Sequence, residues 1–268
     1  DVDTAISEIK NKKFQITDIS SKVVSRNPSG PFTTSTLQQV ASSRLGFGAS
    51  RTMQIAQKLY QGIEIDGETI GLITYMRTDG TNLSADAISD FRSFIKNKYG
   101  KEYLPENPLN YSGKKAKNAQ EAHEAIRPTD IIRSPDSVKK YLSPDQQKLY
   151  NLIWSRALSS QMETAKFDRN TITISSEDNQ TICKTSGSVL KFDGYLKVFP
   201  SPNKDDDEEI LPEMSKGPIN IEAILDEQHF TQPPPRYSEA SLVKKLEELG
   251  IGRPETYAST ISTIQNRG

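Results

Sequence analysis

The sequence predicts an α+β protein of several domains, in which a helical block is inserted into a β-rich domain. Most helical patterning falls within residues 33–166, whereas the segments with the alternating pattern of strands fall before and after it, within 1–32 and 167–232. A chain of 268 residues is long enough for two or more domains. The triple proline at 233–235 is a stiff boundary, and we expect residues 233–268 to begin a further, truncated helical domain.

The first elements are predicted from spacing and from stop signals. Residues 14–24 alternate apolar and polar side chains, as a half-buried strand does. A helix then ends at Gly46, and a second helix, with Ser50 as its N-cap, ends at Gly62.

Two later helices have stronger start signals. Ser84 is the expected N-cap of a helix that Gly100 ends. Ser143, Pro144 and Gln146 form the pattern of a capping box with proline at the first helical position. We interpret the apolar faces of both helices as core packing.

The pattern returns to β after the helical block. Residues 171–174 alternate strictly, apolar residues between 182 and 199 continue in the same style, and a last β segment covers 219–225. The acidic run 205–209 interrupts them. Mg²⁺ is usually held by one or two carboxylates in a shaped pocket, so we interpret this run as a solvated loop.

Composition excludes several classes of function. The net charge is −1, so any DNA contact must come from local basic patches. The single cysteine, Cys183, excludes an internal disulfide and fits a reducing compartment, and with two histidines it leaves no zinc-finger spacing. No apolar run could span a bilayer, so we expect no membrane association. The chain has no signal-like start, and both ends resemble cuts inside a longer protein.

The most informative segment is Thr74-Tyr75-Met76-Arg77-Thr78-Asp79, which follows a short β-like run. A phenol titrates near ~10, so it is a weak nucleophile at neutral pH unless its surroundings favour the phenolate. A guanidinium two residues away can stabilise both the phenolate and an attacked phosphate. Tyr75 and Arg77 are therefore candidate catalytic residues for attack on a phosphodiester. A buried strand tyrosine before a polar turn would share the pattern.

A second candidate site is His123-Glu124-Ala125-Ile126-Arg127, which we expect on a helix over 121–127 that Pro128 ends. His123 and Arg127 would then share one helix face and could hold a phosphate. Lysines at 114, 115 and 117 favour this reading. A solvated face with a Glu–Arg pair is the alternative.

A third candidate site separates two helices predicted near the C-terminus, one over 238–249 and one from Pro254 onwards. Pro254 favours the start of a helix, and the free backbone N–H groups at a helix start bind anions. Arg253 and Thr256 lie beside this expected helix start. Such a terminus would bind phosphate without reading bases. A purely structural helix–turn–helix is the alternative.

These motifs, in this order, closely resemble those of the bacterial DNA topoisomerase I family, whose members are type IA enzymes. They are residues 74–79, residues 123–129, and the run 236–242 that continues to Gly252-Arg253-Pro254. Residues 31–39 match as well, so the resemblance covers nearly the whole chain. Met76 is typical of this branch, since the sister topoisomerase III enzymes usually carry proline there.

The resemblance implies a mechanism. Tyr75 would attack single-stranded DNA and form a 5′-phosphotyrosine, another strand would pass through the gap, and religation would need no ATP. The substrate would be negatively supercoiled DNA. Arg77 would stabilise the attacked phosphate. Residues expected to contact DNA are Asp79, His123, Arg127, Arg253, Thr256 and Arg267.

The resemblance also implies that part of the enzyme lies outside this chain. The family's Toprim domain, with its acidic Mg²⁺ site, normally precedes this region. We therefore expect an internal fragment that is inactive alone, with Mg²⁺ bound by the missing domain and no metal site in this chain. The helical block would carry the tyrosine, and the β-rich part would be the hinge, or arch, of a toroid. Gly80 and Glu255 depart from the family pattern, which usually has serine at both positions.

The expected protein is a monomer in the bacterial cytoplasm, at the nucleoid, whose partners are DNA and its own Toprim domain. A non-catalytic module that binds single-stranded nucleic acid, or a scaffold with the same fold, is the alternative. A tyrosine recombinase would not show this order of motifs.

Overall fold

The computed structural model describes residues 2–111, 123–201, 211, 214–225 and 227–267. The chain divides into two compact units. The sheet unit comprises Asp1–Arg26, Ala165–Asp193 and Asn203–Pro235, and the helical unit comprises Asn27–Thr164, Gly194–Pro202 and Arg236–Gly268. The lysines at 114, 115 and 117 and the acidic run 205–209 lie outside the described residues.

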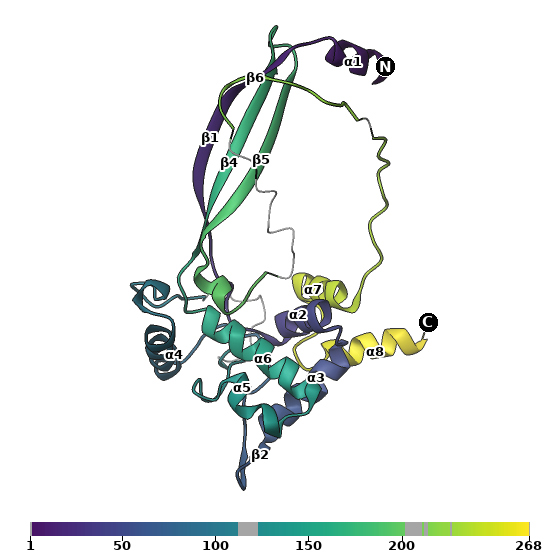
Figure 1. Cartoon of the computed structure of the whole chain (residues 1–268). Helices are drawn as coiled ribbons and strands as arrows, with labels where there is room; N and C mark the ends of the chain where they lie inside the picture. Colours follow the sequence, from purple (N-terminus) through teal and green to yellow (C-terminus); the bar gives the residue numbers. More distant parts are fainter. Residues whose placement is uncertain (1, 112–122, 202–210, 212–213, 226, 268) are drawn as a thin grey trace. The chain divides into compact units, whose positions relative to one another are not determined.

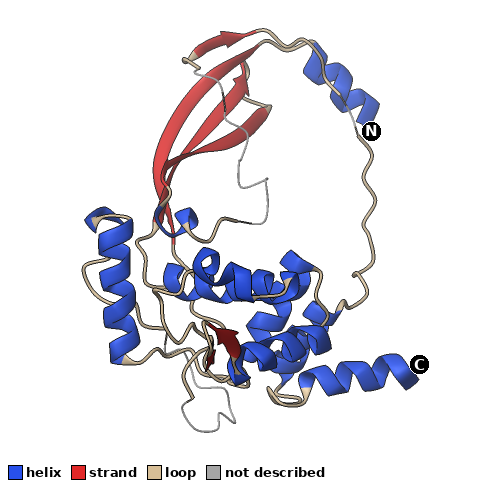
Figure 2. Ribbon diagram, turned by 60° about the horizontal axis from the view of Figure 1, so that its bottom comes forward, coloured by secondary structure: helices blue, strands red, loops and turns tan. Residues whose placement is uncertain are grey.

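Antiparallel strands in the order β5-β4-β1-β6 build the sheet unit (Figure 1). Its elements are α1 Val2–Lys10, β1 Phe14–Arg26, β4 Ala165–Ser176, β5 Ile182–Phe192 and β6 Gly217–Ile219. The β1–β4 ladder runs from the pair Phe14–Ser176 to the pair Arg26–Ala165. The long strands twist along their length, as Figure 2 shows.

One carboxylate holds the turn between β4 and β5. Asp178 accepts hydrogen bonds from the Ser176 hydroxyl and from the Gln180 backbone N–H, and it forms an ion pair with Lys12 at 3.0 Å. These interactions, with the Ser176 hydrogen bond the strongest influence, lower the pKa of Asp178 from 3.8 to about 2.

Helices dominate the helical unit, and a small hairpin completes it (Figure 2). Its α-helices are α2 Thr34–Leu45, α3 Ala49–Gln61, α4 Ala85–Lys98, α5 Pro135–Val138, α6 Pro144–Ser159, α7 Glu239–Leu249 and α8 Tyr257–Arg267. The remaining elements are the hairpin strands β2 Ile63–Ile65 and β3 Glu68–Ile70 and the 3-10 helices η1 Lys101–Tyr103, η2 Lys139–Tyr141 and η3 Gly194–Lys197. Helices and an antiparallel sheet together confirm the α+β class.

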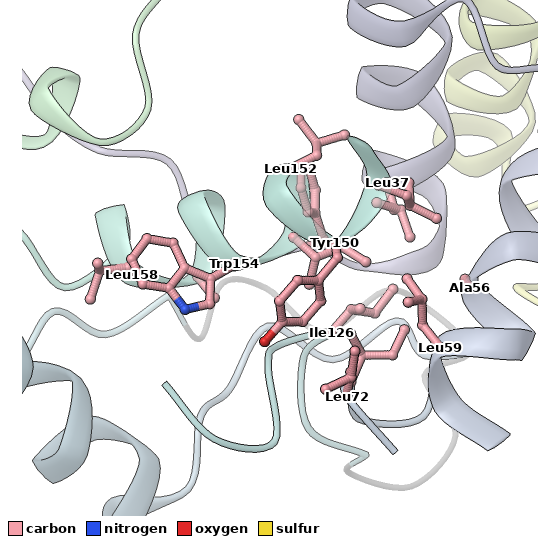
Figure 3. Close-up of a cluster of buried hydrophobic side chains, with 14 of the residues drawn as sticks. Leu37, Ala56, Leu59, Leu72, Ile126, Tyr150, Leu152, Trp154 and Leu158 are labelled. Carbon is pink, nitrogen blue, oxygen red and sulfur yellow. The ribbon is translucent and has the colours of Figure 1, made fainter. Parts of the chain in front are cut away.

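The apolar core of the helical unit gathers around α6. Side chains from α2, α3 and the chain at Ile126 lie beside Tyr150 of α6, as Figure 3 shows. The buried Tyr150 hydroxyl donates to the backbone carbonyl of Arg133 at 2.6 Å, and the Trp154 indole N–H donates to that of Ile131 at 3.0 Å. Both polar tips are therefore satisfied inside the core.

The structure confirms several of the helix caps that the sequence predicts. Ser84 caps α4, and Ser143 with Gln146 forms the capping box of α6. Gly46 ends α2 with a left-handed φ of 67°, a conformation that glycine adopts without strain.

Three local predictions are wrong. Ser50 lies inside α3, because the N-cap is Gly48. The β pattern expected up to residue 199 stops at Phe192, and a 3-10 helix follows, because Phe199 is buried in the helical core instead. The strand expected over 219–225 is β6, which ends at Ile219.

Candidate active site

The tyrosine segment, residues 74–79, lies between the hairpin and α4 without being a regular strand. Ile73, just before it, forms an isolated antiparallel bridge with Pro128. The Thr74 hydroxyl donates to the carbonyl of Ala125 at 2.8 Å. The extended chain before Pro128 therefore fixes where the segment begins.

Thr34, the first residue of α2, holds the middle of the tyrosine segment. Its N–H donates to the Thr78 carbonyl at 2.9 Å, and its hydroxyl accepts from the Thr78 N–H at 2.8 Å. The same hydroxyl donates to the Met76 carbonyl at 2.7 Å. Because Thr34 is fully buried, water does not compete for these bonds.

Buried side chains alternate with more exposed ones along the tyrosine segment. Met76 and Thr78 are buried and anchor it, whereas Arg77 and Asp79 are exposed and Tyr75 is half-buried. The backbone is therefore fixed from inside, while the phenol packs against the core and the guanidinium and the carboxylate stay exposed.

The Tyr75 ring contacts two other rings. Its centroid lies 5.4 Å from that of Tyr60, on α3, with an interplanar angle of 66°, and 5.7 Å from the His123 imidazole at 58°. Within the described residues, the Tyr75 hydroxyl has no hydrogen-bond partner, and the Arg77 guanidinium has neither a hydrogen bond nor an ion pair. Packing orients the phenol, and both polar groups stay available to a ligand.

The helix predicted over 121–127 is wrong in its described part, which is extended. Ile126 forms an antiparallel bridge with Phe32, and its N–H donates to the Phe32 carbonyl at 2.8 Å. Ile126 is completely buried, and this tertiary pairing overrides the local helical pattern. His123 and Arg127 therefore do not share a helix face.

Arg127 is engaged within the protein. Its Nε donates to the Glu124 carboxylate at 2.7 Å, and a terminal nitrogen donates to the Pro128 carbonyl at 3.0 Å. Burial by itself would raise the pKa of Glu124, but hydrogen bonds with Arg127 and Ser84 lower it below its ordinary value. The structure thus contains the Glu–Arg pair of the alternative interpretation, and a DNA contact by Arg127 stays a prediction.

Arg253 and Thr256 lie in the turn before α8. The helix begins at Tyr257, after a turn over 254–256, rather than at Pro254. The Thr256 hydroxyl accepts from the Arg253 N–H at 2.9 Å, so it caps the turn from inside. The Arg253 side chain is exposed, as is that of Arg267 in the last turn of the same helix.

Helices α7 and α8 contact the elements that hold the tyrosine segment. Glu247 of α7 accepts a hydrogen bond from the Ser35 hydroxyl at 2.6 Å. Burial raises the pKa of Tyr257, and the nearby carboxylates of Glu247 and Asp79 raise it further. The charge of Asp79 is therefore felt at the start of α8.

Sequence reasoning missed three residues that shape this region. Thr34 and Tyr60 position the tyrosine segment, and Glu239 accepts a hydrogen bond from the Ala49 N–H at 2.7 Å. Glu239 thereby caps α3, whose own N-cap, Gly48, has no side chain to do so. No local signal could have identified Glu239, because it lies 190 residues from its partner.

Gly80 marks a close approach of two backbones. A Cβ at this position would lie 2.1 Å from the carbonyl oxygen of His123. The serine usual in the family would therefore displace one of the two chains. Glycine lets the chain at His123 lie directly against the tyrosine segment.

Two features are absent from the described residues. No group of three or more His, Cys, Asp or Glu side chains in this part of the chain could hold a metal ion. No helix there has the length and apolar character needed to cross a bilayer.

Comparisons with known proteins place this arrangement in a family. A family model described as DNA topoisomerase matches residues 1–268. DNA topoisomerase 1 of Rickettsia felis is 53% identical over 264 residues, which are 97% of this chain and 34% of that protein. The Salmonella typhimurium protein of the same name is 47% identical, covering 98% of this chain and 29% of that protein.

A solved structure agrees. Full-length topoisomerase I from Thermotoga maritima matches with a TM-score of 0.85 and 39% identity, over 100% of this chain and 43% of that one. The chain thus spans about a third of the length of the curated relatives it matches. By its sequence and its fold, the chain belongs to the bacterial type IA DNA topoisomerase I family.

Proposed function

We propose that this chain provides the DNA-cleaving tyrosine of a type IA topoisomerase. The supporting observation is the geometry of Tyr75: ring contacts with Tyr60 and His123 orient the phenol, whose hydroxyl has no partner among the described residues. Arg77 follows two residues later with an exposed guanidinium.

In the proposed reaction, the Tyr75 oxygen attacks the phosphorus of a phosphodiester in single-stranded DNA. The phenol gives up its proton as its oxygen bonds to phosphorus, the bond from phosphorus to the 3′ oxygen breaks, that 3′ oxygen takes up a proton, and the 5′ phosphate stays on Tyr75. Arg77 stabilises the negative charge of the phosphate during attack. The 3′ hydroxyl later reverses the same steps and religates the strand, so no ATP is consumed.

The other proposed DNA contacts have unequal support. His123 has the strongest, because its ring touches that of Tyr75. The charge of Asp79 influences Tyr257, the first residue of α8, which follows the turn with Arg253 and Thr256. Arg127 has the weakest support, because its guanidinium is already paired with Glu124. Arg267 is supported only by its exposure.

We propose that Mg²⁺ is bound by a Toprim domain elsewhere in the protein. The carboxylates described in this chain form no group that fits the ion. The sheet unit would act as the hinge of a toroid, so that the tyrosine swings away while a second strand passes. The whole protein would relax negatively supercoiled DNA as a monomer at the bacterial nucleoid, and this chain alone would not.

Covalent trapping tests the nucleophile. The chain, joined to a Toprim domain, is incubated with Mg²⁺ and negatively supercoiled DNA, and denaturant then traps any protein–DNA adduct. Tyr75→Phe should abolish both the adduct and relaxation. Tyr141→Phe is the matched control, because Tyr141 is a phenol in the same unit whose hydroxyl bonds to the surface residue Asp66.

The outcomes separate the two candidate functions. An adduct of equal yield with Tyr75→Phe would refute the nucleophile assignment. DNA binding without any adduct from the unsubstituted protein would favour a non-catalytic module for single-stranded nucleic acid.

A further inference from the structure

Two arginines of the helical unit lie against the same phenylalanine ring. The guanidinium carbon of Arg44, in the last turn of α2, is 4.0 Å from the ring centroid of Phe199. The guanidinium carbon of Arg156, on α6, is 5.2 Å from that centroid and 5.1 Å from the centroid of Phe32. Two helices and the chain after η3 thus bring two cations together.

Neither cation has a counter-charge within the described residues. Arg156 makes one hydrogen bond, from Nε to the Gly30 carbonyl at 2.7 Å, and Arg44 makes none. Tyr111 lies near Arg156, but its hydroxyl bonds to two backbone carbonyls. Burial, mainly, raises the pKa of Tyr111 to about 12, so it is a neutral phenol at neutral pH.

This arrangement is unfavourable without a ligand. Burial and then the charge of Arg44 lower the pKa of Arg156 to about 10. Partly buried like charges that lack a carboxylate destabilise a fold, and most proteins pair them. Both side chains are half-buried, and their unused N–H groups reach solvent. An external anion could therefore supply the missing charge.

We propose that Arg44 and Arg156 bind the phosphate backbone of single-stranded DNA at a second site, separate from the phosphate that Tyr75 attacks. This inference rests on the proposed function, which makes DNA the ligand. Planar guanidiniums match phosphate oxygens in pairs of hydrogen bonds, and the rings of Phe32 and Phe199 hold them in place. Contacts of this kind position a strand without reading its sequence.

Helix α2 links the two sites. Thr34 at its start holds the tyrosine segment, and Arg44 lies ten residues further on, which is about 15 Å at the helical rise. The axial rise of a stacked duplex strand, ~3.4 Å per phosphate, is the lower bound for a single strand, so that distance covers at most four or five phosphates. A strand must therefore extend several nucleotides beyond Tyr75 to reach the arginines.

DNA affinity as a function of oligonucleotide length tests the site. The protein used is this chain joined to a Toprim domain and carrying Tyr75→Phe, which prevents cleavage. Fluorescence anisotropy measures binding of labelled single strands of about 4 and about 20 nucleotides at several salt concentrations. Arg44→Gln and Arg156→Gln are compared with Arg51→Gln. Arg51 also lies over a phenylalanine ring, but it is already paired with Asp145.

The expected result depends on length. Arg44→Gln weakens binding of the long strand roughly tenfold and leaves the short strand unchanged. The slope of log affinity against log salt falls by about 0.7 for each phosphate that the variant no longer neutralises. Arg44→Lys restores most of the slope, because it keeps the charge, and Arg51→Gln changes neither quantity.

Equal binding of the long strand by Arg44→Gln and its parent at every salt concentration would overturn the second site and leave the proposed function intact. Failure of the parent protein to bind either strand would instead count against the proposed function itself. Thermal unfolding of each variant checks its fold. If Arg156→Gln does not fold, the binding data for Arg44→Gln alone test the second site.

Discussion

A single buried hydroxyl fixes the backbone beside the proposed nucleophile. Thr34 bonds to both Met76 and Thr78, the two buried residues of the tyrosine segment. Arg77 and Asp79, which are exposed, take their backbone positions from this anchor. The position of the candidate site therefore depends on a side chain that is buried beneath it.

Thr34→Val should loosen this anchor. The substitution keeps the side-chain shape but leaves the Thr78 N–H without its acceptor and the Met76 carbonyl without its donor. We expect a loss of about 1–3 kcal/mol in the free energy of unfolding, measured with urea, and a lower yield of covalent adduct. Thr34→Ser, which keeps the hydroxyl, should recover most of both, and equal values for valine and threonine would contradict this role.

Asp178 gives the sheet unit an acid-sensitive turn. Its folded pKa is about 2, below the ordinary 3.8, so its stabilising effect is fully present above about pH 4. The effect is lost as pH falls towards about 2, when the carboxylate takes up a proton and releases Ser176 and Lys12. An NMR titration of the Asp178 carboxyl carbon should show this low midpoint, and a midpoint near 3.8 would contradict it. Asp178→Asn should remove the acid dependence of the turn.

Among the secondary-structure elements, some helices are capped by the residue just before them and others by a residue far along the chain. Helices α4 and α6 are capped by serines that directly precede them, so the sequence predicts their starts. Helix α3 begins after a glycine, and Glu239 of α7 supplies its cap from far along the chain. The same carboxylate places negative charge at the positive end of the α3 dipole.

Glu239→Ala should therefore destabilise a helix to which it does not belong. We expect a loss of about 1–2 kcal/mol, the usual effect of removing an N-cap, and faster hydrogen exchange at the Ala49 amide. Glu239→Gln should lose less, because an amide oxygen still accepts the bond. Glu248→Ala is the control: Glu248 is exposed, and its one ion pair within the described ranges is with Lys245, so its loss should stay within about 0.5 kcal/mol. Unchanged exchange at Ala49 would exclude the cap.

In the molecule as a whole, most buried apolar side chains lie in the helical unit. The main buried cluster, which includes Leu59, Tyr150 and Phe199, belongs entirely to the helical unit. The sheet unit depends more on its ladders, because most of β1 beyond Ile16 is not buried. The two units should therefore respond differently to a change in the core.

Leu59→Ala should destabilise the helical unit selectively. Leu59 is fully buried, and removing its side chain leaves a cavity that costs about 2–5 kcal/mol. Hydrogen exchange should show lower protection in α3 and α6 and unchanged protection in the β1–β4 ladder. An equal loss of protection in both units would mean that the whole chain unfolds as one cooperative body.

The sequence predicts those parts of the fold whose causes are local. Alternation predicts β1 and β4, and the serine caps predict α4 and α6. The helix expected at His123 is wrong because buried pairing with Phe32 outweighs the helical spacing of that segment. The sequence also proposes Tyr75 and Arg77 as a pair, but the rings of Tyr60 and His123 around Tyr75 come from chain folding that no spacing reveals.

The contact of α7 and α8 with α2 and α3 differs in character from the main core. Its apolar part is a small cluster of Ala49, Val243, Tyr257 and Ile261, and carboxylate hydrogen bonds from Glu239 and Glu247 complete it. So small an apolar contact contributes less burial than the main core, and it re-forms readily. We therefore expect the contact of α7 and α8 with α2 and α3 to open and close reversibly. The tyrosine segment and Thr34, which holds it, would stay together on the side of α2 and α3.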